Sequence, residues 1–191
     1  MLDLRTQAQA QYFEAMAALM GSGVALARAL DTLAAAAPSA ELRAESARLA
    51  AELQGGCTLS QAMANAPLVF GPRAVAFVRA GEVGGVLDAT SAALARALRA
   101  TDGQADESWF LHLFGVLLEA GVPYSLALSS AASVLDEPRR QACGGAPGEL
   151  ARALRQAGGF TPLTVEFIAV GEELGQLATL CLRAAELLGK G

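Results

Sequence analysis

The stretch "FVRAGEVGGVL" covers Phe77 to Leu87, and a closely similar stretch, "FIAVGEELGQL", covers Phe167 to Leu177. The two begin 90 residues apart, since 167 − 77 = 90, and they share Phe, Gly, Glu, Gly and Leu at the same positions. A chain of 191 residues is long enough for two small domains. The repeated stretch therefore predicts that one folding unit is present twice.

The composition favours helices throughout the chain. Hydrophobic residues make up 53% of the sequence but aromatic residues only 5%. The surplus is Ala and Leu, which are strong helix formers, whereas β-branched residues that favour sheets are few. We expect an all-α protein.

Breakers and capping residues divide the first half into six short helices. The first should stop at Gly21–Gly23 and the sixth should end near Arg99. Between them, the expected starts or ends are at Leu26, Ser39, Gly55–Gly56, Thr58, Pro72 and Val86.

The second half repeats this order with a deletion. Gly23–Val24 aligns with Gly121–Val122 at an offset of 98, whereas Gly81–Glu82 aligns with Gly171–Glu172 at an offset of 90. The difference, 98 − 90 = 8, places the deletion in the third helix of the second copy, around 136–145. We therefore expect two tandem six-helix bundles, residues 1–101 and 102–191, the second with a shortened third helix.

The repeated segment has an expected structural role. The first glycine should end the fifth helix or let it turn sharply, the glutamate should cap the free N–H groups of the sixth helix, and the second glycine should permit close packing. The residues concerned are Gly81, Glu82, Gly85, Gly171, Glu172 and Gly175.

Catalysis, metals and cofactors are not indicated. Lys190 is the only lysine and His112 the only histidine, which argues against a P-loop, a Schiff base, a Ser-His-Asp triad or a His-rich metal site. The cysteines, Cys57, Cys143 and Cys181, lack metal-ligand spacing. A helical module that binds a small ligand remains an alternative, because a groove between bundles would leave no sequence signature.

Localisation and partners follow from charge and hydropathy. The net charge is −5, and the acidity lies in residues 102–191, where eleven acids face six bases. The sequence shows no basic face for nucleic acid and no targeting presequence, so we expect a cytoplasmic protein. The longest apolar segment, Ser108 to Leu135, contains Glu119 and is interrupted at Gly121 and Pro123, so no membrane span is expected.

Three segments, "YFEAMAALMGSGVALARALDTL", "GCTLSQAM" and "FVRAGEVGGVLD", resemble the cytoplasmic domain of the type II secretion system F protein and its type IV pilus relatives, the inner-membrane platform proteins. The resemblance covers residues 5–99 well and returns more faintly over 106–188, in "GVPYSLALSSA" and "VGEELGQL". It implies two antiparallel six-helix bundles and a protein-transport scaffold that meets the assembly ATPase and other inner-membrane components. A soluble helical adaptor without a secretion role is the alternative.

The departures from this family concern the membrane and the binding surface. Family members place transmembrane helices after each domain, whereas here the polar segment "RATDGQADES" joins the two copies. A naturally soluble relative and an engineered form without the spans both agree with this sequence. The small residues Ala18, Ala25 and Ala29 suggest a surface on the first two helices for self-association or partner binding. Glu172 and Glu173 are the candidates for a basic partner.

Overall fold

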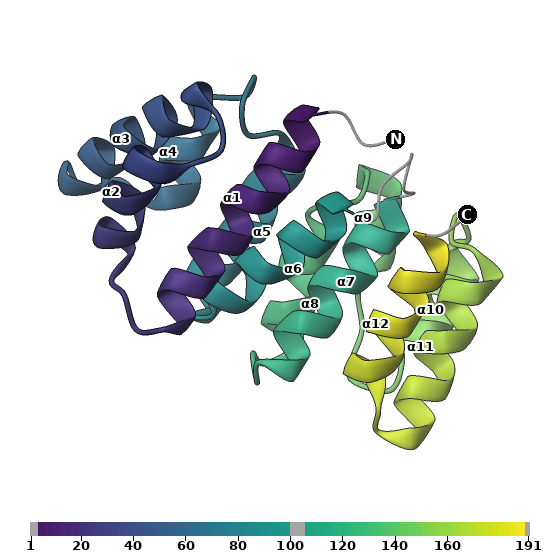
Figure 1. The fold of residues 1–191 in the computed structure, drawn as a ribbon. Coiled ribbons are helices and arrows are strands. Elements are labelled where there is room, and N and C mark those ends of the chain that lie inside the picture. Colours follow the sequence, from purple (N-terminus) through teal and green to yellow (C-terminus); the bar gives the residue numbers. More distant parts are fainter. Residues whose placement is uncertain (1–3, 100–105, 190–191) are drawn as a thin grey trace. The chain divides into compact units, whose positions relative to one another are not determined.

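The computed structural model describes residues 4–99 and 106–189, and every regular element in these ranges is an α-helix (Figure 1). The all-α prediction is confirmed for this part of the chain. The helices are α1 Leu4–Gly21, α2 Leu26–Ala36, α3 Ala40–Gln54, α4 Leu59–Ala64, α5 Pro72–Gly84, α6 Leu87–Arg99, α7 Asp106–Glu119, α8 Tyr124–Ala132, α9 Glu137–Ala142, α10 Leu150–Ala157, α11 Pro162–Leu174 and α12 Leu177–Leu188. None of these described helices combines the length and apolar character needed to cross a membrane.

The chain divides into two compact units, residues 1–99 and 100–191. Helices α1 to α6 lie in the first unit and α7 to α12 in the second. The polar segment expected to join the copies, residues 99–108, overlaps the end of α6 and the first three residues of α7. Its central part, 100–105, and with it the boundary predicted after residue 101, lies outside the described residues.

The core of the first unit is built on α1. This helix packs along α6, while α5 contacts both α4 and α6, and α2 pairs with α3. The inner stripe of α1 carries Tyr12, Phe13 and Met16, all fully buried. The ring of Phe13 lies edge-on to that of Tyr12, with 5.3 Å between centroids, and 6.1 Å from that of Phe70. Aromatic and sulfur side chains thus fix α1 against the segment that leads into α5.

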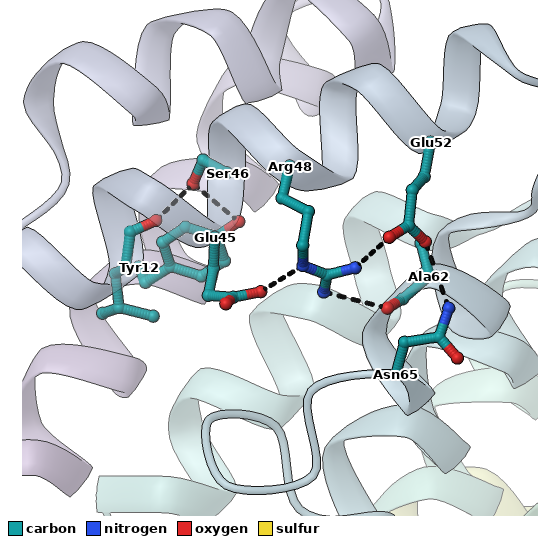
Figure 2. A network of polar contacts seen from close by, with 8 residues as sticks. Tyr12, Glu45, Ser46, Arg48, Glu52, Ala62 and Asn65 are labelled. Atoms are coloured by element: carbon teal, nitrogen blue, oxygen red, sulfur yellow. Dashed lines mark hydrogen bonds and ion pairs between the residues drawn. The ribbon is translucent and has the colours of Figure 1, made fainter.

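A polar network ties α3 to α1 and α4 (Figure 2). The buried Ser46 hydroxyl donates to the carbonyl of Leu42 at 2.7 Å, and its oxygen lies within hydrogen-bond distance of the Tyr12 hydroxyl at 3.1 Å. Arg48 pairs with two glutamates of its own helix and donates to the Ala62 carbonyl of α4 at 3.0 Å. Each polar group that this face of α3 buries therefore has a partner.

The second unit is centred on α7, which packs against α12 and α8. A Cβ atom on Gly115 would lie 2.8 Å from the Leu182 Cγ and 2.9 Å from the Ala178 carbonyl oxygen. Glycine therefore permits the close approach of α7 and α12.

At the start of α7, the buried Glu107 carboxylate accepts hydrogen bonds from the Thr161 backbone N–H and from the hydroxyls of Thr161 and Thr164.

Local sequence signals set several helix ends. The helix start expected at Ser39 and the N-cap expected at Thr58 are confirmed. Both residues are N-caps, because their hydroxyls accept from the backbone N–H groups of Leu42 and Gln61. The Gln61 side chain returns a bond to the Thr58 N–H at 3.0 Å, which completes a capping box. In the second unit α9 has six residues, whereas α3 in the first has fifteen.

Candidate functional site in the repeated glycine and glutamate segment

The carboxylate of Glu82 binds the N-terminus of α4. It accepts a hydrogen bond from the Leu59 backbone N–H at 2.5 Å and from the Ser60 backbone N–H at 3.3 Å. These are two of the N–H groups that a helix leaves without an intrahelical partner, and they lie at the positive end of the helix dipole. The carboxylate thus connects α5 to α4 across 23 residues of sequence.

Glu172 makes the same connection in the second unit. Its carboxylate accepts from the Leu150 N–H at 2.8 Å and from the Ala151 N–H at 3.2 Å, at the start of α10. Neither Leu150 nor its preceding residue Glu149 supplies a side-chain cap, so Glu172 provides the side-chain acceptor for this helix end. Each glutamate therefore binds the backbone N–H groups at the start of a helix in its own unit.

The expectation that these glutamates cap the sixth helix of each copy is wrong. Helix α5 continues to Gly84, so Glu82 lies within its final turn and not in the connection to α6. From there the side chain reaches the neighbouring α4, and α11 holds Glu172 in the same way beside α10. Each glutamate therefore joins its own helix to the start of the helix that precedes it in the chain.

The roles expected of the two glycines are also exchanged. Gly81 does not end α5, because the helix continues to Gly84 and its C-cap is Gly85, whose φ of 69° is in the left-handed region. Gly175 is the corresponding C-cap of α11, with a φ of 66°. Gly81 is instead the packing residue: a Cβ there would lie 2.1 Å from the Thr90 Oγ1 and 2.8 Å from the Leu87 Cα.

Gly171 in the second unit approaches α12 in the same way. A Cβ atom added to it would lie 2.9 Å from the Leu177 Cα. Because the obstacle in both units is backbone, a side chain at either glycine would push the paired helices apart.

The residues expected to bind partners fall into three groups. Ala18 and Ala25 are exposed, as a binding surface requires. Ala29 is fully buried beside Leu30, so its assignment to an exposed surface is wrong. In the second unit Glu173 is exposed, whereas Glu172 is occupied by the start of α10 and is not free for a basic partner. Ala18 and Ala25 lie in one unit and Glu172 and Glu173 in the other, so no unit holds all of them.

The thiols of the second unit are poorly suited to nucleophilic or metal chemistry. Burial raises the pKa of Cys143 and of Cys181 to about 12, so both remain protonated at neutral pH, whereas the thiolate is the reactive and ligating form. Among the described residues no group of three or more His, Cys, Asp or Glu side chains is placed to hold a metal ion.

The model of the type II secretion system protein F family matches residues 12–109 of the chain. This segment is slightly more than half of the chain, and the chain belongs to that family. It spans α1 from Tyr12 through α6 and enters α7, so it includes both Glu82 and the α4 end that this carboxylate binds. A comparison with curated proteins gives no match.

Proposed function

We propose that the chain is a non-enzymatic scaffold of a type II secretion or type IV pilus machine and that it binds other components, above all the assembly ATPase. The observation that carries this proposal is the family match, which runs from the core of the first unit through its Glu82 cap to the start of the second. The members of this family that the sequence resembles serve as platforms in the inner membrane.

We infer in addition that the second unit is another F-type bundle, so that the chain holds two tandem copies. Glu172 binds the start of α10 as Glu82 binds the start of α4. The turns after these glutamates agree as well, since a left-handed glycine follows three residues later in each unit. These shared contacts support a duplication in which the third helix became shorter.

The proposed location is the cytoplasm, with recruitment to the inner-membrane face through partners. The proposed binding surface is the exposed part of the first hairpin, which contains Ala18 and Ala25. Small residues allow a partner helix to approach closely, and the same surface would support self-association. Glu173 offers a second, acidic contact for a basic partner.

Binding of the purified chain to the assembly ATPase of the same organism tests this proposal. We expect calorimetry to detect binding and the double substitution Ala18→Glu and Ala25→Glu to weaken it about tenfold, because each substitution places a charge where a helix should pack. Pro123→Glu is the matched control, since it lies 98 residues after Ala25 and is also exposed. Light scattering on the same variants reports self-association.

Two results would contradict the proposal. Unchanged binding in the alanine variants, together with loss of binding in Glu173→Arg, would move the interface to the second unit. No binding to the ATPase or to other components encoded beside it would favour the soluble adaptor or ligand-binding alternative.

A further inference from the structure

A groove of about 470 Å³ lies in the first unit, where the end of α1, the start of α2 and the α5–α6 turn meet. Its lining includes four apolar side chains and two carboxylates: Met20, Val24, Leu26, Leu87, Glu82 and Asp88. The four apolar side chains are each half-buried, so they expose hydrocarbon to the groove. All of these residues belong to one unit.

The groove has one carboxylate available to a cation. Asp88 is exposed in the first turn of α6, and within the described residues no ion pair joins its carboxylate to a base. Glu82 faces the same space, but its carboxylate is already bound to α4. The ends of α1 and α5 and the starts of α2 and α6 border the groove, so the helix dipoles contribute partial charges of both signs. Asp88 is therefore the group through which the groove can bind a cation.

The corresponding part of the second unit has a different lining. At the offsets of 98 and 90 established above, Leu26 corresponds to Tyr124 and Asp88 to Ala178. The Tyr124 hydroxyl is buried, and its ring lies edge-on to Phe114 with 5.8 Å between centroids. Burial raises the pKa of Tyr124 to about 12, with the nearby Glu172 carboxylate as the next cause. The second unit thus has an aromatic residue in place of Leu26 and a small apolar residue in place of Asp88.

We propose that the groove of the first unit receives an arginine side chain from a partner protein. Long basic side chains pack their methylene stem on apolar surface while the charged end stays at the rim. Met20, Val24, Leu26 and Leu87 offer that surface. A guanidinium group has five donors in a fixed plane and can bind the Asp88 carboxylate through two of them. In the second unit Tyr124 stands in place of Leu26 and Ala178 in place of the acid, so we expect no such site there.

A titration of the full chain with n-butylguanidinium tests the groove directly, because this probe carries the arginine head group and most of its stem. We expect the amide resonances of Gly23, Val24, Gly85 and Leu87 to shift and saturate in the millimolar range. N-butylurea, a neutral probe of nearly the same shape, should produce no saturable shift. Asp88→Asn should weaken guanidinium binding about fivefold, the effect of removing one exposed ion pair.

Exchanging the lining residues between the units sharpens the test. Leu26→Tyr should abolish the shifts in the first unit, whereas Tyr124→Leu combined with Ala178→Asp should create saturable shifts at Val122 and Gly175 in the second. Shifts that survive both Asp88→Asn and Leu26→Tyr, or that appear equally in both units of the parent chain, would overturn the proposal. If Leu26→Tyr does not fold, Asp88→Asn and the gain of a site in the second unit decide the result. No ATPase is present in this titration, so its failure is distinct from failure of the proposed function.

Discussion

The two units anchor the start of their fifth helix by hydrogen bonds of opposite direction. In the first unit Gln9 and Arg5, both on α1, donate to the carbonyls of Val69 and Leu68, just before α5. In the second unit Glu107, which corresponds to Gln9 at the offset of 98, accepts from the backbone and side chains at the start of α11. Gly71 caps α5 without a side chain, whereas Thr161 supplies a hydroxyl to α11. The contact between the first helix of a unit and the start of its fifth helix is therefore kept in both units. Side chains of α1 donate the hydrogen bonds in the first unit, whereas a side chain of α7 accepts them in the second.

The largest expected effect is at Glu107. Glu107→Ala should lower the free energy of unfolding of the second unit by about 3 kcal/mol, because it leaves a buried N–H and two hydroxyls without their acceptor. Trp109, the only tryptophan, lies in this unit, so its fluorescence during urea unfolding is a suitable probe. Gln9→Ala is the matched control. It should cost the first unit about 1 kcal/mol, measured by amide hydrogen exchange, because Gln9 is half-buried whereas Glu107 is buried. Equal losses in the two units would contradict the difference in burial on which this comparison depends.

The next effect concerns the packing glycines. Gly81→Ala should lower the free energy of unfolding of the first unit by about 2 to 3 kcal/mol, since its methyl group would collide with Thr90 and with the backbone at Leu87. Gly171→Ala should cost somewhat less, because at the same position the nearest atom is 2.9 Å away and not 2.1 Å. Amide hydrogen exchange in α5–α6 and α11–α12 measures both. A larger loss for the second unit would contradict the packing described here.

A smaller effect is expected at Asp136, which caps α9 through the Arg139 N–H at 3.0 Å and also pairs with the Arg139 side chain. These bonds lower the pKa of Asp136, so its stabilising effect is lost as the pH falls through that lowered pKa. Asp136→Ala should slightly lower the free energy of unfolding at pH 7, because α9 loses its side-chain N-cap. It should cost nothing at a pH where the parent carboxyl is protonated. Urea unfolding of parent and variant at both pH values tests this, and a constant difference would contradict it.

Thiol reactivity should distinguish Cys57 in the first unit from Cys181 in the second. Cys57 is exposed, whereas Cys181 is buried and has a pKa raised to about 12. We expect iodoacetamide at pH 8 to modify Cys57 first and Cys181 only after unfolding, which peptide mass spectrometry can follow. Because the unfolded thiol ionises near pH 8.5, this burial stabilises the fold below that pH, and the contribution declines as the pH rises toward 12. Rapid modification of Cys181 in the folded chain would contradict its burial.

Local signals in the sequence predicted the helices well. Thr58 and Ser39 cap helices through bonds to residues three positions away, and Pro72 starts α5 as a first-turn proline. Such contacts depend only on nearby residues. The position of Ala29 could also have been predicted, since it precedes Leu30 and lies one helical turn before Leu33 on the buried stripe of α2.

Contacts between distant segments explain the errors. Glu82 and its acceptor site are 23 residues apart, so the sequence does not reveal which helix the carboxylate reaches. Gly81 suggested a helix end because glycine is a poor helix former, but its position is set by the approach of Leu87 and Thr90 from α6. The groove was missed for the same reason, since its lining comes from four helices and the loops that join them.

The central structural claim is that the repeated glutamate holds the fourth helix of its own unit, and amide hydrogen exchange in Glu82→Gln and Glu172→Gln tests it most directly. We predict that Glu82→Gln lowers protection at Leu59 and Ser60, and that Glu172→Gln lowers it at Leu150 and Ala151. Each loss should correspond to about 1 kcal/mol, the usual size of a helix-cap contribution. Protection at the starts of α6 and α12 should stay unchanged. Loss of protection there, with α4 and α10 unaffected, would contradict the account.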